Sequence, residues 1–267
     1  MPDYLLDKEF NEAKNRLTLN ELVQDPATIR YLKKIKVHKN WHCLELGGGA
    51  GSITSWLCEK VAENGRVTVI DLETRFLEQL NYNNLKVLKE DISQYDFGVE
   101  KYDLIHGRDI LVHINNRDEV LEKISKAVKF NGWILLEEPD VSVDIPDPTA
   151  LEEEKNLYKK VTACIYMFLQ KSGLDPYYGA KLLGKLRSTG FTSLHAEGHT
   201  QMFKGGIDSE KSPHLLAFEQ LEETLVSGKY LSKKEFGDFW ELSKNKNFAW
   251  REGLTMSVWG KKTKKDS

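Results

Sequence analysis

Residues 43–51 read Cys-Leu-Glu-Leu-Gly-Gly-Gly-Ala-Gly, and a second apolar run, residues 66–70, ends in Asp71. An apolar strand that leads into a glycine-rich turn and a helix, followed by a second strand ending in an acid, is typical of a nucleoside-binding βαβ unit. The glycines let the backbone approach a ligand closely, and the acid can accept hydrogen bonds from both hydroxyls of a ribose. This stretch therefore predicts a nucleoside-binding site, but by itself it does not indicate a reaction.

The composition excludes several classes of protein. The chain has 267 residues, of which 40% are hydrophobic, enough for one α/β domain with additions. With 38 basic and 41 acidic residues the formal net charge is −3, so we expect no nucleic-acid and no membrane partner. The three cysteines are scattered, no metal-ligand spacing is present, and the chain starts without a signal-peptide pattern. We therefore expect a cytoplasmic protein with no metal.

Helix-like and strand-like runs alternate along the first half of the chain. After two helices, expected over 11–22 and from Pro26 to residue 35, the pattern predicts strands at 42–46, 66–70, 85–88, 102–106 and 133–137. Helices are expected between them at 52–61, 74–80 and 117–128. This alternation predicts an α/β fold, a Rossmann-like and mostly parallel sheet with helices on both faces.

The alternation stops after Pro139. Residues 144–148 hold two prolines and are expected to form a loop. Beyond it we expect helices over 149–171, 177–187, 212–226 and 232–244, and strands over 191–203 and 254–259.

Four expected strand ends carry side chains that suit a nucleoside, and the ends of parallel strands share one edge of a sheet. Glu45, beside the glycine turn, suits a ligand with a positive amino group better than a pyrophosphate, and Asp71 suits a ribose. At the third end a carboxylate, Asp91 or its neighbour Glu90, can accept from an adenine amine while Ile92 packs on the ring. The fourth end, residues 106–109, is expected near the reactive end of the bound molecule.

Together these motifs resemble the class I S-adenosylmethionine-dependent methyltransferases, in particular bacterial enzymes that act on small molecules, often in secondary metabolism. Glu45-x-Gly47-x-Gly49-x-Gly51 is similar to that family's first motif, Asp71 to its acidic second-strand end, and Asp91-Ile92 to its adenine-contacting pair. Residues 102–105 and 131–137 resemble its fourth strand and the entry to its fifth. The family implies seven strands, with the last antiparallel and inserted beside the fifth, and helical cap insertions.

The resemblance implies S-adenosylmethionine as the cofactor and S-adenosylhomocysteine as its product. The cofactor contacts that it implies are Glu45, Gly47, Gly49, Gly51, Ser52, Asp71, Leu72, Asp91, Ile92, Gly107 and Arg108. The catalytic candidates are His113 and Arg108. We expect a helical cap at 1–40, a cofactor-binding core at 41–143, a cap insertion at 144–178, and the rest of the core at 179–267 with a helical insertion at about 205–246.

Several roles have alternatives. His113 is either a general base toward a substrate hydroxyl or amine, or a buried residue that fixes its loop. Arg108 lies near the cofactor's carboxylate or the substrate, or it pairs with Asp109 or Asp140. Ser52 contacts the ligand, caps the following helix, or does both.

The expected reaction is methyl transfer to a nitrogen, oxygen or carbon atom of a small organic molecule. Such a displacement mainly requires alignment and exclusion of water, so the sequence does not separate these three acceptors. A nicotinamide-dependent oxidoreductase on a related sheet and a non-catalytic cofactor-binding paralogue are the alternatives.

Overall fold

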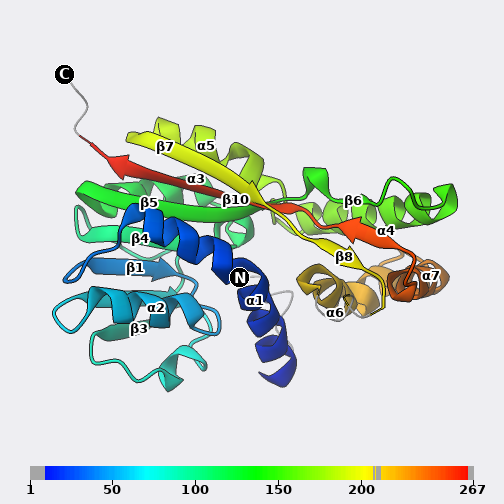
Figure 1. Cartoon of the computed structure of the whole chain (residues 1–267), viewed down its shortest axis with the longest axis horizontal. Coiled ribbons are helices and arrows are strands. Elements are labelled where there is room, and N and C mark those ends of the chain that lie inside the picture. The colour runs from blue at the N-terminus through cyan, green and yellow to red at the C-terminus, as the bar shows by residue number, and fades with distance from the viewer. Residues whose placement is uncertain (1–9, 207, 209–211, 264–267) are drawn as a thin grey trace. The chain divides into compact units, whose positions relative to one another are not determined.

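The computed structural model describes residues 10–206, 208 and 212–263 (Figure 1). The chain forms two compact units, which we call unit 1 and unit 2. Unit 1 comprises Met1–Leu22, Asp140–Pro176 and Thr200–Leu254, and unit 2 comprises Val23–Pro139, Tyr177–His199 and Thr255–Ser267. The division into core and cap segments expected from the sequence stays a prediction.

The two helices expected before residue 36 are a single helix, α1 (Phe10–Ile35), with Pro26 inside it. The prediction was wrong because it took the proline as the start of a new helix. Pro26 has no N–H and cannot donate to the carbonyl of Leu22, yet the helix continues through this missing bond. The two compact units divide at the same place, between Leu22 and Val23.

Unit 2 is built on a seven-stranded sheet in the order β3-β2-β1-β4-β5-β10-β7. Its first five strands pair in parallel: β1 (His42–Leu46), β2 (Arg66–Asp71), β3 (Leu85–Lys89), β4 (Tyr102–Arg108) and β5 (Val128–Asp140). β10 (Leu254–Lys262) lies between β5 and β7 (Phe191–His199) and runs antiparallel to β7. The predicted fold class, with an antiparallel last strand beside the fifth, is confirmed.

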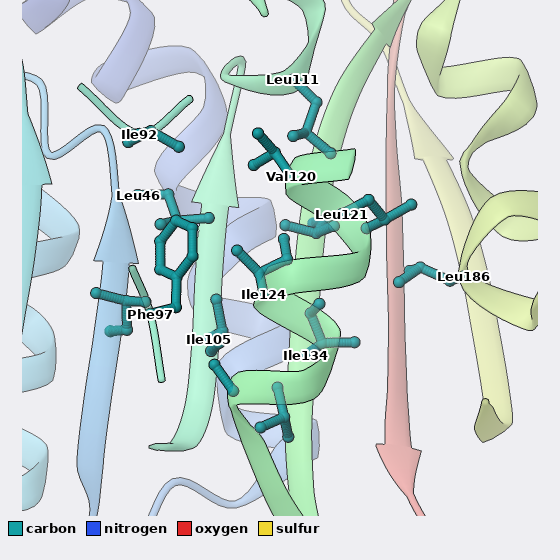
Figure 2. Packing of buried hydrophobic residues seen from close by; sticks show 14 of the residues in the cluster. Leu46, Ile92, Phe97, Ile105, Leu111, Val120, Leu121, Ile124, Ile134 and Leu186 are labelled. Carbon is teal, nitrogen blue, oxygen red and sulfur yellow. The ribbon is translucent and has the colours of Figure 1, made fainter. Parts of the chain in front are cut away.

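Side chains of the central strands alternate between two apolar layers, as a strand's period of two requires. On one face, Cys43, Leu104 and Leu135 pack with residues of α2 (Ser52–Val61) and the second half of α1. On the other, their neighbours Leu44, Ile105 and Leu136 pack with α3 (Arg117–Ala127) and α5 (Tyr178–Ser188). Figure 2 shows this second layer, with Ile105 and Ile134 of the sheet beneath Ile124 of α3.

The helix expected over residues 74–80 is only a short 3-10 turn, η1 (Leu77–Gln79). Side chains at the start of the segment accept hydrogen bonds from nearby backbone: Asp71 Oδ1 from Glu73 N at 3.0 Å, and Glu73 Oε1 from Arg75 N at 3.0 Å. Such local bonds compete with helical ones, so the prediction failed here because its periodicity argument ignored them.

Unit 1 combines helices with a small sheet in the order β6-β9-β8. Its helices are α4 (Glu152–Lys171), α6 (Pro213–Ser227) and α7 (Lys233–Lys244), and its strands are β6 (Ile145–Pro146), β8 (Met202–Lys204) and β9 (Ala249–Arg251). The loop expected at 144–148 thus contains a strand, and the single strand expected over 191–203 is two strands of different sheets. Strands this short carry too little periodicity to be detected.

In the part of the chain that the structure describes, no helix is long and apolar enough to cross a membrane.

Candidate functional site

The predicted site residues lie along the carboxyl edge of the parallel strands of unit 2. Glu45 lies in β1, Asp71 ends β2, Asp91 follows β3, and Arg108 ends β4. Because β3, β2, β1 and β4 are neighbours in that order, the sheet places the four segments side by side. This edge is where open α/β sheets bind their ligands.

The glycine turn follows β1 and leads directly into α2. Gly47 donates its N–H to the carbonyl of Ile70 on β2 at 2.8 Å and has a φ of +69°. A Cβ at Gly47 would lie 2.0 Å from Cδ1 of Ile110, so a side chain there would have to displace that residue. Gly51, with a φ of +99°, is the N-cap of α2, which begins at Ser52. Ser52 is therefore not the capping residue, and its ligand contact stays a prediction.

Asp71 joins the turn to the end of β2. Its Oδ2 accepts from the N–H of Gly49 at 3.2 Å, and its Oδ1 accepts from Glu73 N. Burial raises the pKa of Asp71, although these N–H donors oppose the shift. A carboxylate has about four acceptor sites, so Asp71 keeps capacity for further donors such as hydroxyls.

The next strand end presents an acid beside two apolar side chains. Asp91 Oδ1 accepts from Ser93 N at 2.9 Å, which holds this carboxylate in place, whereas the side chain of Glu90 is exposed. Ile92 is buried, with 8% of its surface exposed, and Leu72, directly after β2, is 50% exposed. A carboxylate acceptor and apolar side chains at neighbouring strand ends can together recognise a flat ring with an exocyclic amine.

Glu45 is more enclosed than the sequence suggested. Only 2% of its surface is exposed, because it points to the face of the sheet that α1 and α2 cover. Its Oε2 accepts from Thr54 Oγ1 of α2 at 2.6 Å, and its Oε1 lies 3.5 Å from Nδ1 of His106. The predicted contact with a ligand's amino group remains a prediction.

His106 on β4 connects Glu45 to a second buried carboxylate. Its Nε2 lies 3.2 Å from Oε2 of Glu137 on β5, and both residues are almost fully buried. Burial works to lower the pKa of His106, but the hydrogen bond to Glu137 and the negative charge of the nearby Glu45 outweigh it and raise this pKa to about 9. The imidazole is therefore a buried cation at neutral pH.

Arg108 is hydrogen-bonded to α1, and of the two acids considered from the sequence, Asp109 acts on it through its charge. Its Nη2 donates to Asp25 Oδ1 at 2.9 Å and its Nη1 to Thr28 Oγ1 at 2.8 Å. The side chain is 10% exposed. Its neighbour Gly107 pairs with Leu46 of β1, and a Cβ on it would lie 3.2 Å from that leucine's Cβ.

Glu138 holds the loop after β4 in place through hydrogen bonds to its backbone. This fully buried carboxylate accepts from the N–H of Leu111 at 2.8 Å, Val112 at 3.0 Å and Ile110 at 3.3 Å. Burial, reinforced by the charge of Asp109, raises the pKa of Glu138 to about 8 against those three donors. Glu138 thus anchors the turn η2 (Leu111–His113), which ends in His113.

The side chain of His113 is exposed, so the alternative that makes it a buried structural residue is wrong. Its N–H donates to the carbonyl of Ile110 at 3.0 Å, which fixes the backbone of the turn. A proton acceptor at this position stays a prediction.

The sequence did not indicate that Glu45, His106 and Glu137 form a network. The available signal was the presence of titratable residues at the ends of two largely apolar runs, His106 in residues 102–106 and Glu137 in residues 133–138. A charge in a buried strand needs a partner, but the partner's identity depends on strand neighbours that are far apart in sequence. Among the described residues, no group of three or more His, Cys, Asp and Glu side chains is placed to hold a metal ion.

Residues 37–189 match the model of a family described as a methyltransferase domain. This span exceeds half of the chain, and the chain belongs to that methyltransferase family.

Among curated relatives, methyltransferase str2 of Strobilurus tenacellus is 27% identical over 145 residues, 52% of this chain and 49% of the relative. A ubiquinone biosynthesis O-methyltransferase of Hydrogenovibrio crunogenus is 28% identical over 160 residues, 57% of this chain and 65% of the relative. The chain thus covers less than two thirds of either relative.

The structure of Haemonchus contortus phosphoethanolamine N-methyltransferase 2, in complex with phosphomonomethylethanolamine and S-adenosylhomocysteine, has the same fold. It is 17% identical, its TM-score is 0.56, and the match covers 93% of this chain and 57% of that one.

Proposed function

We propose that this chain transfers a methyl group from S-adenosylmethionine to a nitrogen, oxygen or carbon atom of a small organic molecule. One observation carries the proposal: the carboxylate of Asp71 ends β2 and is hydrogen-bonded to the glycine turn after β1. A ribose acceptor and a turn open to close backbone approach are thereby joined at one edge of the sheet. Membership of a methyltransferase family supports the reaction type.

The hydrogen-bond acceptors at this edge fit S-adenosylmethionine. Asp71, Asp91 and Glu45 are carboxylates, suited to ribose hydroxyls, an adenine amine and an ammonium group, whereas a pyrophosphate would meet repulsion from all three. We assign the ribose to Asp71, the adenine amine to Asp91, and the faces of the ring to Ile92 and Leu72. Gly47, Gly49, Gly51, Ser52 and Gly107 would line the approach of the ligand to the backbone.

When bound, S-adenosylmethionine supplies a methyl group on a positively charged sulfur. The chain's part is to align the acceptor atom with that group and to keep water away. We propose His113 as the group that takes the acceptor's proton, because its exposed imidazole ends the turn anchored by Glu138. Arg108 uses two of its five N–H donors on α1, and we propose that the others orient the cofactor's carboxylate or the acceptor.

The class of acceptor rests on the curated relatives. One of them is an O-methyltransferase of ubiquinone biosynthesis, and the net charge of −3 gives no general attraction to nucleic acid. We therefore propose a small-molecule acceptor and a first screen that compares phenols with primary amines.

The decisive experiment is calorimetric titration of the full chain with S-adenosylhomocysteine. We expect Asp71→Ala to weaken binding by about 1.5–3 kcal/mol, roughly ten- to a hundredfold, because a charged hydrogen-bond acceptor is lost. Asp96→Ala is the matched control, since Asp96 also bonds a nearby backbone N–H, that of Gly98, but lies at an exposed site.

NADH serves as the competing ligand in the same titration. A preference for NADH, or no binding of S-adenosylhomocysteine, would refute the proposal in favour of an oxidoreductase or another use of the fold. Binding without release of S-adenosylhomocysteine from S-adenosylmethionine across the phenol and amine panel would favour the non-catalytic paralogue.

A further inference from the structure

A histidine between two carboxylates occupies the interior of the sheet next to the glycine turn. His106 pairs in register with Glu45 of β1, and one of its ring nitrogens faces each carboxylate, at 3.5 Å for Glu45 and 3.2 Å for Glu137. The exposed fractions are 1% for His106, 2% for Glu45 and 0% for Glu137. Water therefore does not stabilise either negative charge, and the protein has to supply the partners.

Hydroxyl groups supply the remaining hydrogen bonds of this cluster. Glu45 accepts from Thr54 of α2, and Glu137 accepts from Ser257 Oγ of β10 at 2.6 Å and Thr28 Oγ1 of α1 at 2.7 Å. Hydroxyls are neutral, so they orient the carboxylates without balancing their charge. The cation that lies between the two carboxylates is His106.

The protonation state of the His106 imidazole determines whether an N–H group faces each of the two carboxylates. An imidazolium has two N–H donors, one on each nitrogen, whereas a neutral imidazole has only one. The pKa of about 9 keeps both protons on His106 at neutral pH. Burial works to raise the pKa of Glu137, but the bond from His106 and the charge of Arg108 lower it, which keeps that carboxylate ionised as well.

We propose that His106 is a positioning residue for the cofactor, because it fixes the Glu45 carboxylate at the end of β1, two residues before Gly47. His106 itself contacts no ligand and acts through Glu45. It lies between Glu45 of β1 and Glu137 of β5 and so links the two carboxylates. The inference rests on the proposed function, since it needs the glycine turn to bind S-adenosylmethionine and its product.

The test is calorimetric titration of His106→Gln with S-adenosylhomocysteine, at a temperature where urea unfolding shows the variant to be fully folded. We expect at least a tenfold loss of affinity. His42→Gln is the matched control: His42 lies on β1, the strand beside that of His106, bonds Thr68 Oγ1 at 3.2 Å, and starts β1 at the end opposite the glycine turn. We expect the control to bind within twofold of the wild type.

A double-mutant cycle separates positioning from general structural support. If His106 acts through Glu45, Glu45→Gln with His106→Gln should bind no more weakly than Glu45→Gln alone. Losses that multiply in the double variant would overturn the proposal, as would a folded His106→Gln with wild-type affinity.

Glu137→Gln is the second variant should His106→Gln fail to fold. It keeps His106 and removes one of the two charges that hold its proton, and we expect a three- to tenfold loss of affinity. Wild-type affinity in this variant would also overturn the proposal. If the wild-type protein itself does not bind S-adenosylhomocysteine, the proposed function fails first, and that result is distinct from the variant outcomes.

Discussion

Two pairs of carboxylates are held in opposite ways: Glu45 with Glu137 in unit 2, and Asp144 with Glu252 in unit 1. Glu138 of unit 2, held by backbone N–H groups, behaves like the second pair, because burial raises its pKa. In unit 2, Glu45 and Glu137 face a cation, His106, and the pKa of Glu137 is lowered despite its burial. In unit 1, Asp144 and Glu252 are bonded mainly by neutral donors, and burial raises the pKa of both. The same type of side chain therefore titrates in opposite directions in one molecule.

The donors in unit 1 are aromatic and aliphatic hydroxyls and an indole. Tyr158 donates to Asp144 Oδ1 at 2.7 Å and Tyr166 donates to Asp144 Oδ2. Ser212 donates to Glu252 Oε1, and the contact from Trp250 Nε1 is longer, at 3.5 Å. The imidazole Nδ1 of His214 lies 3.8 Å from Glu252 Oε2.

The comparison shows that hydrogen bonds from neutral donors alone do not offset the rise in pKa that burial causes. A neutral donor recovers part of the lost hydration, while a cation in contact also supplies the Coulomb attraction that burial strengthens. A buried ion pair is costly to break, because the remaining partner stays in the interior with its charge. The following three predictions test this difference.

The largest effect is expected for Glu137→Ala. It removes the carboxylate that is hydrogen-bonded to the cation His106, and we expect the free energy of unfolding to fall by about 3–5 kcal/mol. Glu252→Ala, which removes a carboxylate held mainly by neutral donors, should cost less, about 1–3 kcal/mol. Urea unfolding gives the totals, and hydrogen exchange with mass spectrometry assigns each loss to its unit. Equal losses would contradict the distinction between the two carboxylate pairs.

A smaller effect is expected from pH. The pKa of His106 is raised from 6.5 to about 9 on folding, so its contribution is complete below pH 6.5 and disappears as the pH rises through 9. We expect this loss to be on the order of 3 kcal/mol, and His106→Gln to remove that part of the slope in urea unfolding measured from pH 6 to 10.

His42 supplies the opposite slope as a control. Burial, with the charge of Arg66, lowers its pKa to about 4, so its contribution is present above pH 6.5 and is lost as the pH falls through 4. His42→Gln should therefore alter the acid side of the profile and leave the range from 6.5 to 9 unchanged. An alkaline slope that survives in His106→Gln would assign it to another group, such as Glu138.

The smallest effect is expected for Tyr158→Phe in unit 1. It removes one hydroxyl donor from Asp144 and leaves Tyr166 in place, so the free energy of unfolding should fall by only about 1 kcal/mol. Tyr82→Phe is the matched control, because Tyr82 donates to the carboxylate of Glu59 at an exposed site, and it should change stability by less than about 0.5 kcal/mol. A loss in Tyr158→Phe as large as that of Glu137→Ala would mean that neutral donors are as important as a cation.

Local sequence patterns were sufficient to predict the bounds of a helix or strand where nearby residues in the sequence determine its structure. The strand over residues 42–46 was predicted with its observed bounds, because a short apolar run ends at glycines that cannot continue it. α2 was also predicted with its observed bounds, over residues 52–61. The helix over residues 74–80 failed because side-chain bonds to the local backbone replaced the helical ones.

The site divides in the same manner. The sequence was enough to select Asp71 and the glycines, because each sits at a strand end and such ends meet at one edge of a parallel sheet. The pairing of Arg108 with Asp25 was not accessible, since it depends on where α1 crosses the sheet. The three amide bonds of Glu138 were not accessible either, because they follow from the path of the loop after β4.

The order of apolar runs, glycines and acids along the chain was thus enough to predict the fold class. It also predicted which edge of the sheet forms the candidate site. It did not predict the state of the buried charges, because Glu45, His106 and Glu137 come from three strands and meet only when β1, β4 and β5 pair in register. Burial removes water from these groups, so their protonation depends on the partners that the register brings within hydrogen-bond distance. Residue types along the chain indicate which groups can carry charge, and packing determines which of them do.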